Sequence, residues 1–397
     1  MAAKVQVGIV GAGPAGLLLA QLLARRGIGS RVLERSSREH VEERIRAGVL
    51  ESSTVDTLHA AGVGERLARE GVVHRGIELR FGGAAHRIDF EALVPGHNIT
   101  VYGQREVVRD LIAARLGDAQ AGPEHLSFEV SEVELAGLSS ERPELSYRAA
   151  GERRSFVCDW VVGCDGHHGV SRRWLPPGSS RLFEREFPCA WLGVLAQVAP
   201  STRELIYARH ERGFALHSMR TPSLSRFYLQ VAPDEDLASW SDERIWQELR
   251  VRLETVPGWR LEAGPILERG LAAMRSEVIE PMRHGRLLLA GDAAHIVPAT
   301  GAKGLNLAVA DVRLLSEALG AWYERGNCDL LDGYSAACLE RVWRVQNFSS
   351  WMTRLLHTFA SDDAFERRLQ LAQLEQLAHC RAAATLLAEN YVGVARS

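Results

Sequence analysis

The sequence VQVGIVGAGPAG occupies positions 5–16 and decides the fold of the N-terminal part of the chain. A short apolar run at 5–10 predicts a buried strand, and it ends in a G-x-G-x-x-G turn formed by Gly11, Gly13 and Gly16. Residues 17–26 read as a buried helix closed by Gly27, and residues 30–34 read as the next strand. Glu34 follows Gly16 at the spacing at which a carboxylate meets an adenosine ribose. The pattern therefore predicts a β-α-β unit that binds a dinucleotide.

A second turn of this kind lies near the other end of the chain. The apolar run 287–290 leads into GDAAH at 291–295, and TGAKGLN at 300–306 opens a helix. Two nucleotide-contacting turns so far apart in sequence indicate one long ligand held from two sides, and FAD is the common ligand of that length. Lys303 and Lys4 are the two lysines among 47 basic residues. We interpret Lys303 as a compact cation beside the flavin, with a chance survivor of an arginine-rich composition as the alternative.

Composition excludes several classes of protein. A net charge of −3 without blocks of like charge argues against a nucleic-acid binder. The six cysteines show no C-x-x-C and no zinc-ligand spacing, which favours reduced thiols and no metal site. The chain enters a strand without a leader pattern, and no apolar run is long enough for a bilayer, so we expect a soluble cytoplasmic protein. Arg172 and Arg173 are interpreted as helix-end or solvated arginines.

The patterning predicts an α/β (α+β) protein with three parts. Residues 1–181 are expected to form a Rossmann-like FAD-binding domain, with a strand at 156–163 and with 72–100 on the substrate side. Alternating segments at 204–208, 214–219 and 226–231 predict an inserted antiparallel sheet domain over 182–281. Residues 282–397 carry the GD motif and then a helical region, whose aromatic residues favour core and dimer packing.

Three separated motifs, GAGPAG at 11–16, CDG at 164–166 and GDAAH at 291–295, match single-component flavoprotein monooxygenases. The chain closely resembles the 4-hydroxybenzoate 3-monooxygenase (para-hydroxybenzoate hydroxylase) family over essentially its whole length. The resemblance is carried by residues 44–51, 101–104, 204–208, 212–216, 287–307 and 388–393. It implies an FAD-dependent hydroxylase that uses NADPH or NADH and O2, a flavin C4a-hydroperoxide as the oxygenating species, and a homodimer.

Such chemistry needs an anchor for an aromatic carboxylate and a proton relay for its phenol, because ionising the 4-hydroxyl activates the ortho carbon. The resemblance assigns the anchor to Ser218, Arg220 and Tyr228, and an arginine fork suits a planar carboxylate. It assigns proton acceptance to Tyr207 and transfer towards solvent to Tyr391 and His74. Ala299 and Thr300 fall beside the phenolic end of the substrate.

The resemblance also places the cofactors. FAD contacts are expected from Gly11, Gly13, Gly16, Glu34, Arg46, Gln104 and Asp292, and flavin-ring contacts from Leu305 and Asn306, next to Lys303, which is interpreted above as a cation beside the flavin. No second G-x-G-x-x-G is present for the nicotinamide cofactor. The family meets NADPH at the surface instead, which implicates Arg35, Arg44, His168 and Arg275.

The chain departs from the family pattern at two places. His40 and Ser36 replace a tyrosine and a glutamine, which leaves NADPH and NADH both open as donors. Ala299 replaces the second proline of a Pro-Pro-Thr-Gly loop. The substrate is therefore 4-hydroxybenzoate or, as an alternative, a 3-amino or 3-hydroxy derivative. A non-catalytic flavoprotein-fold binding module is the alternative of another class.

Overall fold

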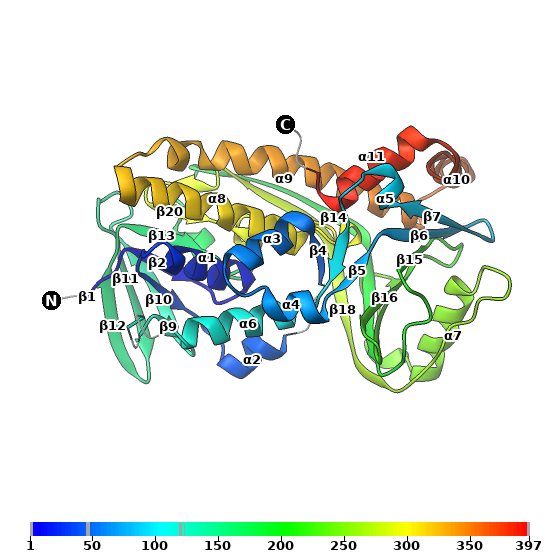
Figure 1. Cartoon of the computed structure of the whole chain (residues 1–397), viewed down its shortest axis with the longest axis horizontal. Coiled ribbons are helices and arrows are strands. Elements are labelled where there is room, and N and C mark those ends of the chain that lie inside the picture. The colour runs from blue at the N-terminus through cyan, green and yellow to red at the C-terminus, as the bar shows by residue number, and fades with distance from the viewer. Residues whose placement is uncertain (1–2, 45–47, 119–120, 123, 395–397) are drawn as a thin grey trace.

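The computed structural model describes residues 3–44, 48–118, 121–122 and 124–394. A six-stranded, mainly parallel sheet lies at the left of Figure 1. In spatial order its strands are β19 (Arg283–His284), β20 (Leu287–Leu289), β13 (Trp160–Gly163), β2 (Val7–Val10), β3 (Ser30–Leu33) and β9 (Leu126–Ser127). The predicted β-α-β unit is confirmed, since β2 and β3 pair in parallel and flank α1 (Pro14–Arg25).

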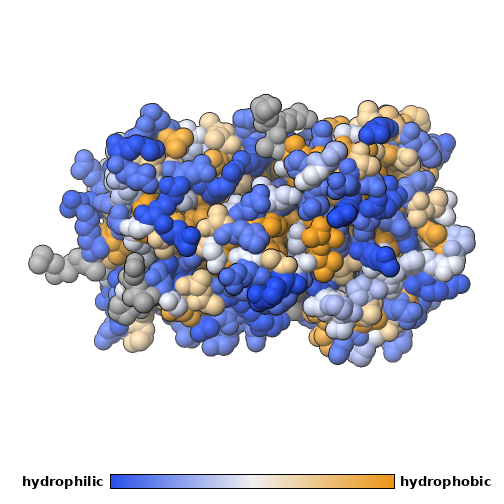
Figure 2. Space-filling view, viewed as in Figure 1, coloured by the Kyte–Doolittle hydropathy of each residue, from blue (hydrophilic) through white to orange (hydrophobic). Residues whose placement is uncertain are grey.

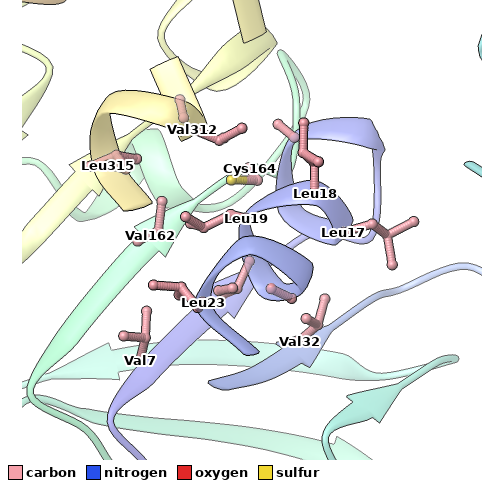
Figure 3. Close-up of a cluster of buried hydrophobic side chains, with 14 of the residues drawn as sticks. Val7, Leu17, Leu18, Leu19, Leu23, Val32, Val162, Cys164, Val312 and Leu315 are labelled. Atoms are coloured by element: carbon pink, nitrogen blue, oxygen red, sulfur yellow. The ribbon is translucent and has the colours of Figure 1, made fainter. Parts of the chain in front are cut away.

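Helix α1 is packed on both sides. Its leucines, with Leu19 and Leu23 among them, meet Val7 and Val162 of the sheet, as well as Val312 and Leu315 of α8 (Gly304–Arg325) (Figure 3). The helix begins earlier than expected, because Pro14 is tolerated in a first turn, where its missing N–H is not needed. The sheet and α8 thus hold the start of α1 in a fixed position.

A mostly antiparallel sheet of eight strands forms the other half of the molecule, at the right of Figure 1. Among its described strands, β15 and β6 pair in parallel and the other neighbours are antiparallel. In spatial order the strands are β21 (His295–Ile296), β18 (Ile266–Glu280), β14 (Arg181–Ala196), β17 (Leu224–Val231), β16 (Ala215–Thr221), β15 (Leu205–Ala208), β6 (Gly76–Phe81) and β7 (Ala84–Asp89). The three antiparallel segments expected from alternation are therefore confirmed as strands β15 to β17.

Two small sheets complete the strands. One contains β1 (Ala3–Lys4), β12 (Glu152–Val157), β11 (Glu144–Ala149) and β10 (Ser131–Ala136), and the other contains β4 (Val49–Glu51), β8 (Ile99–Val101) and β5 (Val72–His74). The single strand expected at 156–163 is wrong. The chain leaves β12 at Val157 and enters β13 in a different sheet, because the N–H groups of Cys158 and Asp159 bond to Pro143 and Gln6 instead.

Helices cover the sheets and form the C-terminal region, as expected. The remaining ones are α2 (Arg38–Glu43), α3 (Ser52–Ala60), α4 (Glu65–Glu70), α5 (Phe90–Leu93), α6 (Gln104–Leu116), α7 (Asp242–Leu253), α9 (Asp329–Leu356), α10 (Ala364–His379) and α11 (Arg381–Val392). Short 3-10 turns lie at η1 (Ser171–Trp174), η2 (Leu237–Ser239), η3 (Gly291–Ala293) and η4 (Ala299–Gly301). None of the helices described has the length and apolar character of a membrane span. The face in Figure 2 is largely hydrophilic, with apolar patches among the charged side chains.

Candidate active site

The glycine-rich turn between β2 and α1 has the form of a phosphate cradle. Gly11 has φ +103°, and a Cβ there would lie 2.5 Å from the carbonyl oxygen of Cys164. A Cβ at Gly16 would lie 2.0 Å from the carbonyl oxygen of Gly11, whereas a Cβ at Gly13 would lie 4.0 Å from its nearest neighbour, the carbonyl oxygen of Cys164. No side chain caps α1, so the N–H groups of its first turn are free for an anion. These residues fit the pyrophosphate of FAD.

Glu34 lies directly beside this turn. Its carboxylate accepts hydrogen bonds from the N–H of Ala12 and the N–H of Ser36, both at 2.8 Å. The acid is thereby fixed at the end of β3, where the ribose of a dinucleotide would lie. Gln104 is the first residue of α6, another helix without a side-chain cap.

The GD motif forms η3 and is held by two sets of contacts. Arg172 donates to the carbonyl oxygens of Ala293 (2.7 Å) and Asp292 (3.0 Å) and to the Glu277 carboxylate (2.8 Å). The interpretation of Arg172 as a helix-end or solvated arginine is therefore wrong, because this guanidinium clamps the loop. The Asp292 side chain remains exposed and available to a ligand.

Asp311 of α8 makes the second set of contacts. Its Oδ2 accepts from the N–H of Gly291 at 3.0 Å and pairs with Nε2 of His295 at 2.7 Å. Burial alone lowers the pKa of His295, but the Asp311 carboxylate raises it above the usual value overall. The turn at Gly291, where φ is +60°, is thus tied to the helix that follows it.

The start of α8 carries the three residues expected near the flavin ring. Asn306 uses its whole side chain: Oδ1 accepts from Glu51 N and Thr54 Oγ1, and Nδ2 donates to the carbonyls of Val49 and Ala302. Any flavin contact of Asn306 must therefore use its backbone. Leu305 lies in the first turn of the helix, which has no side-chain cap.

Lys303 is buried behind this turn. Its Nζ donates to Glu51 Oε1 at 2.6 Å and to the carbonyl oxygen of Tyr391 at 2.7 Å. Burial lowers the pKa of Lys303, while the Glu51 carboxylate opposes that shift. A buried ammonium thus connects the start of α8 with the last helix of the chain.

One face of the large sheet carries both expected ends of the substrate site. Tyr207 of β15 lies opposite Leu216, and Leu216 lies opposite Tyr228 of β17, so the two tyrosines share a face at a separation of two strands, roughly 10 Å. Ser218 follows Leu216 on the same face, because alternate residues of a strand point to the same side. The register shifts between Met219 and Thr221, and Arg220 reaches this face through its hydrogen bond to Ser218 and its contact with Tyr228.

Arg220 has no acidic partner among the residues described. Its Nη1 donates to Ser218 Oγ at 2.7 Å and to the carbonyl of Met219 at 2.8 Å, while its Nε is buried without a hydrogen bond. Burial lowers the pKa of Arg220, with Tyr228 opposing this effect. An interior guanidinium with unused donor capacity fits a ligand carboxylate.

The two tyrosines of the expected relay are in contact. The hydroxyl oxygens of Tyr207 and Tyr391 lie 2.6 Å apart, and both rings are buried. Burial raises the pKa of Tyr207 above its usual value, while the hydrogen bond from Tyr391 lowers it. Both hydroxyls are therefore protonated at neutral pH, and a proton can pass between them.

His74 is buried at the end of β5 without joining this pair. Neither of its ring nitrogens has a hydrogen-bond partner in the described part of the chain. Burial lowers the pKa of His74 to about 4, against the nearby Glu204 carboxylate, which raises it. The imidazole is thus neutral at pH 7, and its link to the tyrosines stays a prediction.

Thr300 and Ala299 lie in η4. Thr300 is buried and its hydroxyl contacts that of Thr353 at 2.9 Å. Ala299 has an exposed side chain, and its carbonyl accepts the N–H of Ala302 at 2.9 Å. One lone pair of this carbonyl is therefore already used within the turn.

The residues expected to meet the nicotinamide cofactor lie at the surface. Arg35, Arg44 and His168 are exposed, and Arg275 is half-buried with its Nε 3.7 Å from Glu277. Arg46 lies outside the described residues.

Two site residues were missed in the sequence. Arg226 lies opposite Ser218 on the substrate face and is buried, with its Nε and one Nη unpartnered and its guanidinium carbon 5.3 Å from the Tyr228 ring centroid. Gly193 lies opposite Tyr228, and a Cβ there would meet Arg226 at 2.8 Å. The sequence did contain a signal for Arg226: it lies two residues before Tyr228 in an alternating segment, so both side chains are expected on the same face of the strand.

Comparison with known proteins decides the family. Residues 4–349 match the model of the FAD binding domain family. The chain is 46% identical over 391 residues to p-hydroxybenzoate hydroxylase of Acinetobacter baylyi, which covers 98% of this chain and 96% of the relative. The chain belongs to the p-hydroxybenzoate hydroxylase family. It is an FAD-dependent aromatic hydroxylase, so the alternative of a non-catalytic binding module is set aside.

More distant relatives share the fold of this family. The chain is 27% identical to 3-(3-hydroxy-phenyl)propionate/3-hydroxycinnamic acid hydroxylase 2 of Burkholderia vietnamiensis, with 84% of this chain and 60% of that protein covered. The crystal structure of p-nitrophenol 4-monooxygenase from Pseudomonas putida superposes with a TM-score of 0.84 at 19% identity, over 99% of this chain and 100% of the other. At that identity the similarity supports the fold alone.

Proposed function

We propose that this member of the p-hydroxybenzoate hydroxylase family converts 4-hydroxybenzoate into 3,4-dihydroxybenzoate. The reaction consumes NAD(P)H, a proton and O2 and releases NAD(P)+ and water. One observation carries the proposal: the unpaired guanidinium of Arg220 shares a sheet face with the Tyr207–Tyr391 pair. This face offers an anchor for a carboxylate and an exit for a phenolic proton on the same ligand.

In this proposal the free N–H groups at the start of α1, together with Glu34 and Asp292, hold the FAD. When bound, FAD takes the hydride of NAD(P)H and activates O2, and it thereby supplies an electrophilic oxygen atom. The protein itself has to hold the aromatic ring and make its ortho carbon nucleophilic. In this proposal Arg220 and Ser218 bind the carboxylate, and Tyr228 donates a hydrogen bond to it.

The relay begins at Tyr207. Because burial raises its pKa, Tyr207 is no standing base, so its oxygen takes the substrate proton while its own proton passes to Tyr391. His74 then takes the proton, through a bridging water, and releases it near the Arg87–Glu204 ion pair. The ionised phenol pushes electrons into the ring and activates the carbon next to it.

Aromatic rings packed against one another exclude water from the side of the site next to Arg220 and Tyr228. Trp191 lies 4.9 Å from Tyr228 and 5.2 Å from Phe214, measured between ring centroids. Trp191 Nε1 donates to His357 Nε2 at 2.6 Å, so its polar atom is satisfied inside the wall. Excluding water strengthens every charge interaction of the bound carboxylate.

A second substrate class has one observation in its favour. Ala299 lacks the ring of a proline, and its side chain is exposed. With η4 beside the 4-hydroxyl, as the family resemblance implies, the smaller side chain leaves room there. A 3-amino or 3-hydroxy derivative of 4-hydroxybenzoate would occupy that room. Such a pocket discriminates one small group by about 1 to 3 kcal/mol, so a preference is expected, not exclusion.

The decisive experiment measures NAD(P)H oxidation by the FAD-loaded protein across a panel of substituted benzoates, with the products identified by mass. The proposal expects the largest stimulation with 4-hydroxybenzoate and a product heavier by one oxygen atom. Oxidation of NAD(P)H without an oxygenated product from any 4-hydroxybenzoate would overturn it. NADPH and NADH compared in the same assay resolve the donor.

A homodimer is also proposed. Phe365 and Leu369 are exposed four residues apart on α10, where they form one apolar helix face. Light scattering of the FAD-loaded protein tests this, and a monomer mass at micromolar concentration would contradict it.

A further inference from the structure

A cavity of about 310 Å³ lies between α3, α8, α9 and α11, which meet near the upper centre of Figure 1. Lys303 and Asn306, at the start of α8, contribute to its wall. On this side of the cavity Thr54 of α3 donates a hydrogen bond to Asn306 of α8 at 2.7 Å. Neither the anchor nor the tyrosine hydroxyls line this cavity.

The lining of the cavity has more basic than acidic side chains, and its arginines lie outside any ion pair of the described residues. Arg313, Arg341 and Arg344 line it, and none of the three forms an ion pair within the described part of the chain. One terminal nitrogen of Arg341 is also buried without a hydrogen bond. Glu340 and Glu389 line the cavity as well, yet neither pairs with these arginines, and Glu51 is taken by Lys303. The arginines thus retain free donors for an anion.

The rest of the lining combines hydroxyl and amide side chains with an apolar part. The apolar part of the lining includes Leu307 and Phe348, which are buried, and Val345, which lies on α9 between Arg344 and Phe348 in sequence. A small inorganic anion would leave this apolar wall unfilled, whereas a flat ring with one carboxylate matches both parts. A cavity of this size also has room for one benzoate-sized molecule.

We propose that this cavity is a second binding site for a small aromatic carboxylate, held by Arg341 and Arg344 through its carboxylate and by Phe348 and Leu307 through its ring. Such a ligand would lie beside Lys303, whose Nζ bonds the carbonyl of Tyr391. The site therefore touches the far side of the proposed relay without sharing a residue with the substrate anchor. Its existence goes beyond the proposed function and does not depend on it.

Calorimetric titration of the FAD-loaded protein with 4-hydroxybenzoate tests the proposal. The wild type is expected to bind two molecules per chain. Arg341→Gln/Arg344→Gln should keep one molecule and lose the other, or bind it at least about tenfold more weakly, because two charge-assisted contacts are removed. The two single variants run in parallel, in case the double variant does not fold. Arg354→Gln on the exposed side of the same helix is the matched control and should still bind two.

Arg220→Ala separates this inference from the proposed function. If both hold, this variant keeps the second molecule and loses the first. One molecule per chain in the wild type, unaffected by the Arg341 and Arg344 changes, would overturn the second site. Two molecules retained by Arg220→Ala would overturn the proposed anchor and leave the second site standing. Crystals soaked with 4-bromobenzoate should show anomalous bromine density in the cavity, and density confined to the substrate face would contradict the proposal.

Discussion

The hydroxyl oxygens of Tyr207 and Tyr391 lie 2.6 Å apart, although the two residues are separated by 184 positions and belong to a strand and to the last helix. The carbonyl of Tyr391 is in turn held by the buried ammonium of Lys303. A proton path between the large sheet and α11 therefore depends on the docking of the C-terminal helix.

Replacing either tyrosine of this pair by phenylalanine should slow hydroxylation or uncouple it from NAD(P)H oxidation, while FAD stays bound. The reason is that substrate ionisation loses its acceptor. Stopped-flow flavin reduction, with and without 4-hydroxybenzoate, measures the coupling. Tyr323→Phe, at a hydroxyl that bonds Gln6 far from the site, serves as the control. Equal reduction rates with and without substrate in the wild type would sink the coupling.

Arg220→Ala should weaken 4-hydroxybenzoate binding by about 2 to 4 kcal/mol, and Arg220→Lys should lie between the two. Within the described part of the chain the guanidinium has no acidic partner, so the loss falls on the ligand. Binding is followed through the flavin absorbance change on titration. The methyl ester should lose a similar amount, and an ester bound as tightly as the acid would show that the carboxylate lies elsewhere.

His74 should make the protein less stable in mild acid. Its folded pKa of about 4 is below the value near 6.5 expected in the unfolded chain, so only the unfolded chain takes up a proton between these values. The free energy of unfolding therefore falls as the pH drops from about 6.5 to about 4, by at most about 1.4 kcal/mol per pH unit from this residue.

Denaturant unfolding of His74→Gln across that range, with FAD in excess, should show a shallower pH dependence than the wild type. The buried residues His217 and His357 contribute their own slope, so the difference between proteins is the informative quantity. His40→Gln, at an exposed position, should leave the slope unchanged. Parallel slopes for His74→Gln and the wild type would refute a buried neutral His74.

Arg172→Lys should loosen FAD. A lysine has one point charge and cannot reach Ala293, Asp292 and Glu277 in the fork geometry of the guanidinium. We expect a loss of about 1 to 2 kcal/mol in FAD affinity, measured by fluorescence of the released flavin. Arg173→Lys, at the exposed neighbouring residue, should retain wild-type affinity. Unchanged FAD affinity in Arg172→Lys would mean that η3 keeps its shape without this clamp.

Local patterns were sufficient for the elements that carry their own signal. An apolar run, three glycines and an acid within residues 5–34 predict the β-α-β unit. Period-two alternation predicts the strands β15 to β17. The clamp at Arg172 could not be read in this way, because its partners at 277 and 292–293 lie more than 100 positions away and only the fold brings them near. The break between β12 and β13 was missed for a similar reason: both halves are strands, and only their pairing differs.

The site shows the same division. Tyr207 and Tyr391 were named together through the family resemblance, and the structure brings their hydroxyls into contact. The use of the entire Asn306 side chain by Glu51, Thr54, Val49 and Ala302 could not be foreseen, because four tertiary contacts decide it. Arg226 was not predicted as a site residue, because the chain has 45 arginines and burial without an acidic partner is visible only in the structure.

Ala299→Pro should leave the fold intact and stabilise it by up to about 1 kcal/mol. Pro298 has ψ 138°, which a following proline requires, and no described hydrogen bond uses the N–H of Ala299. The added ring should also narrow the space beside the 4-hydroxyl. We therefore expect kcat/KM for 3,4-dihydroxybenzoate and 3-amino-4-hydroxybenzoate to fall relative to 4-hydroxybenzoate. The difference corresponds to at most about 1 to 3 kcal/mol in activation free energy. If both ratios match those of the wild type, Ala299 carries no information about the substrate.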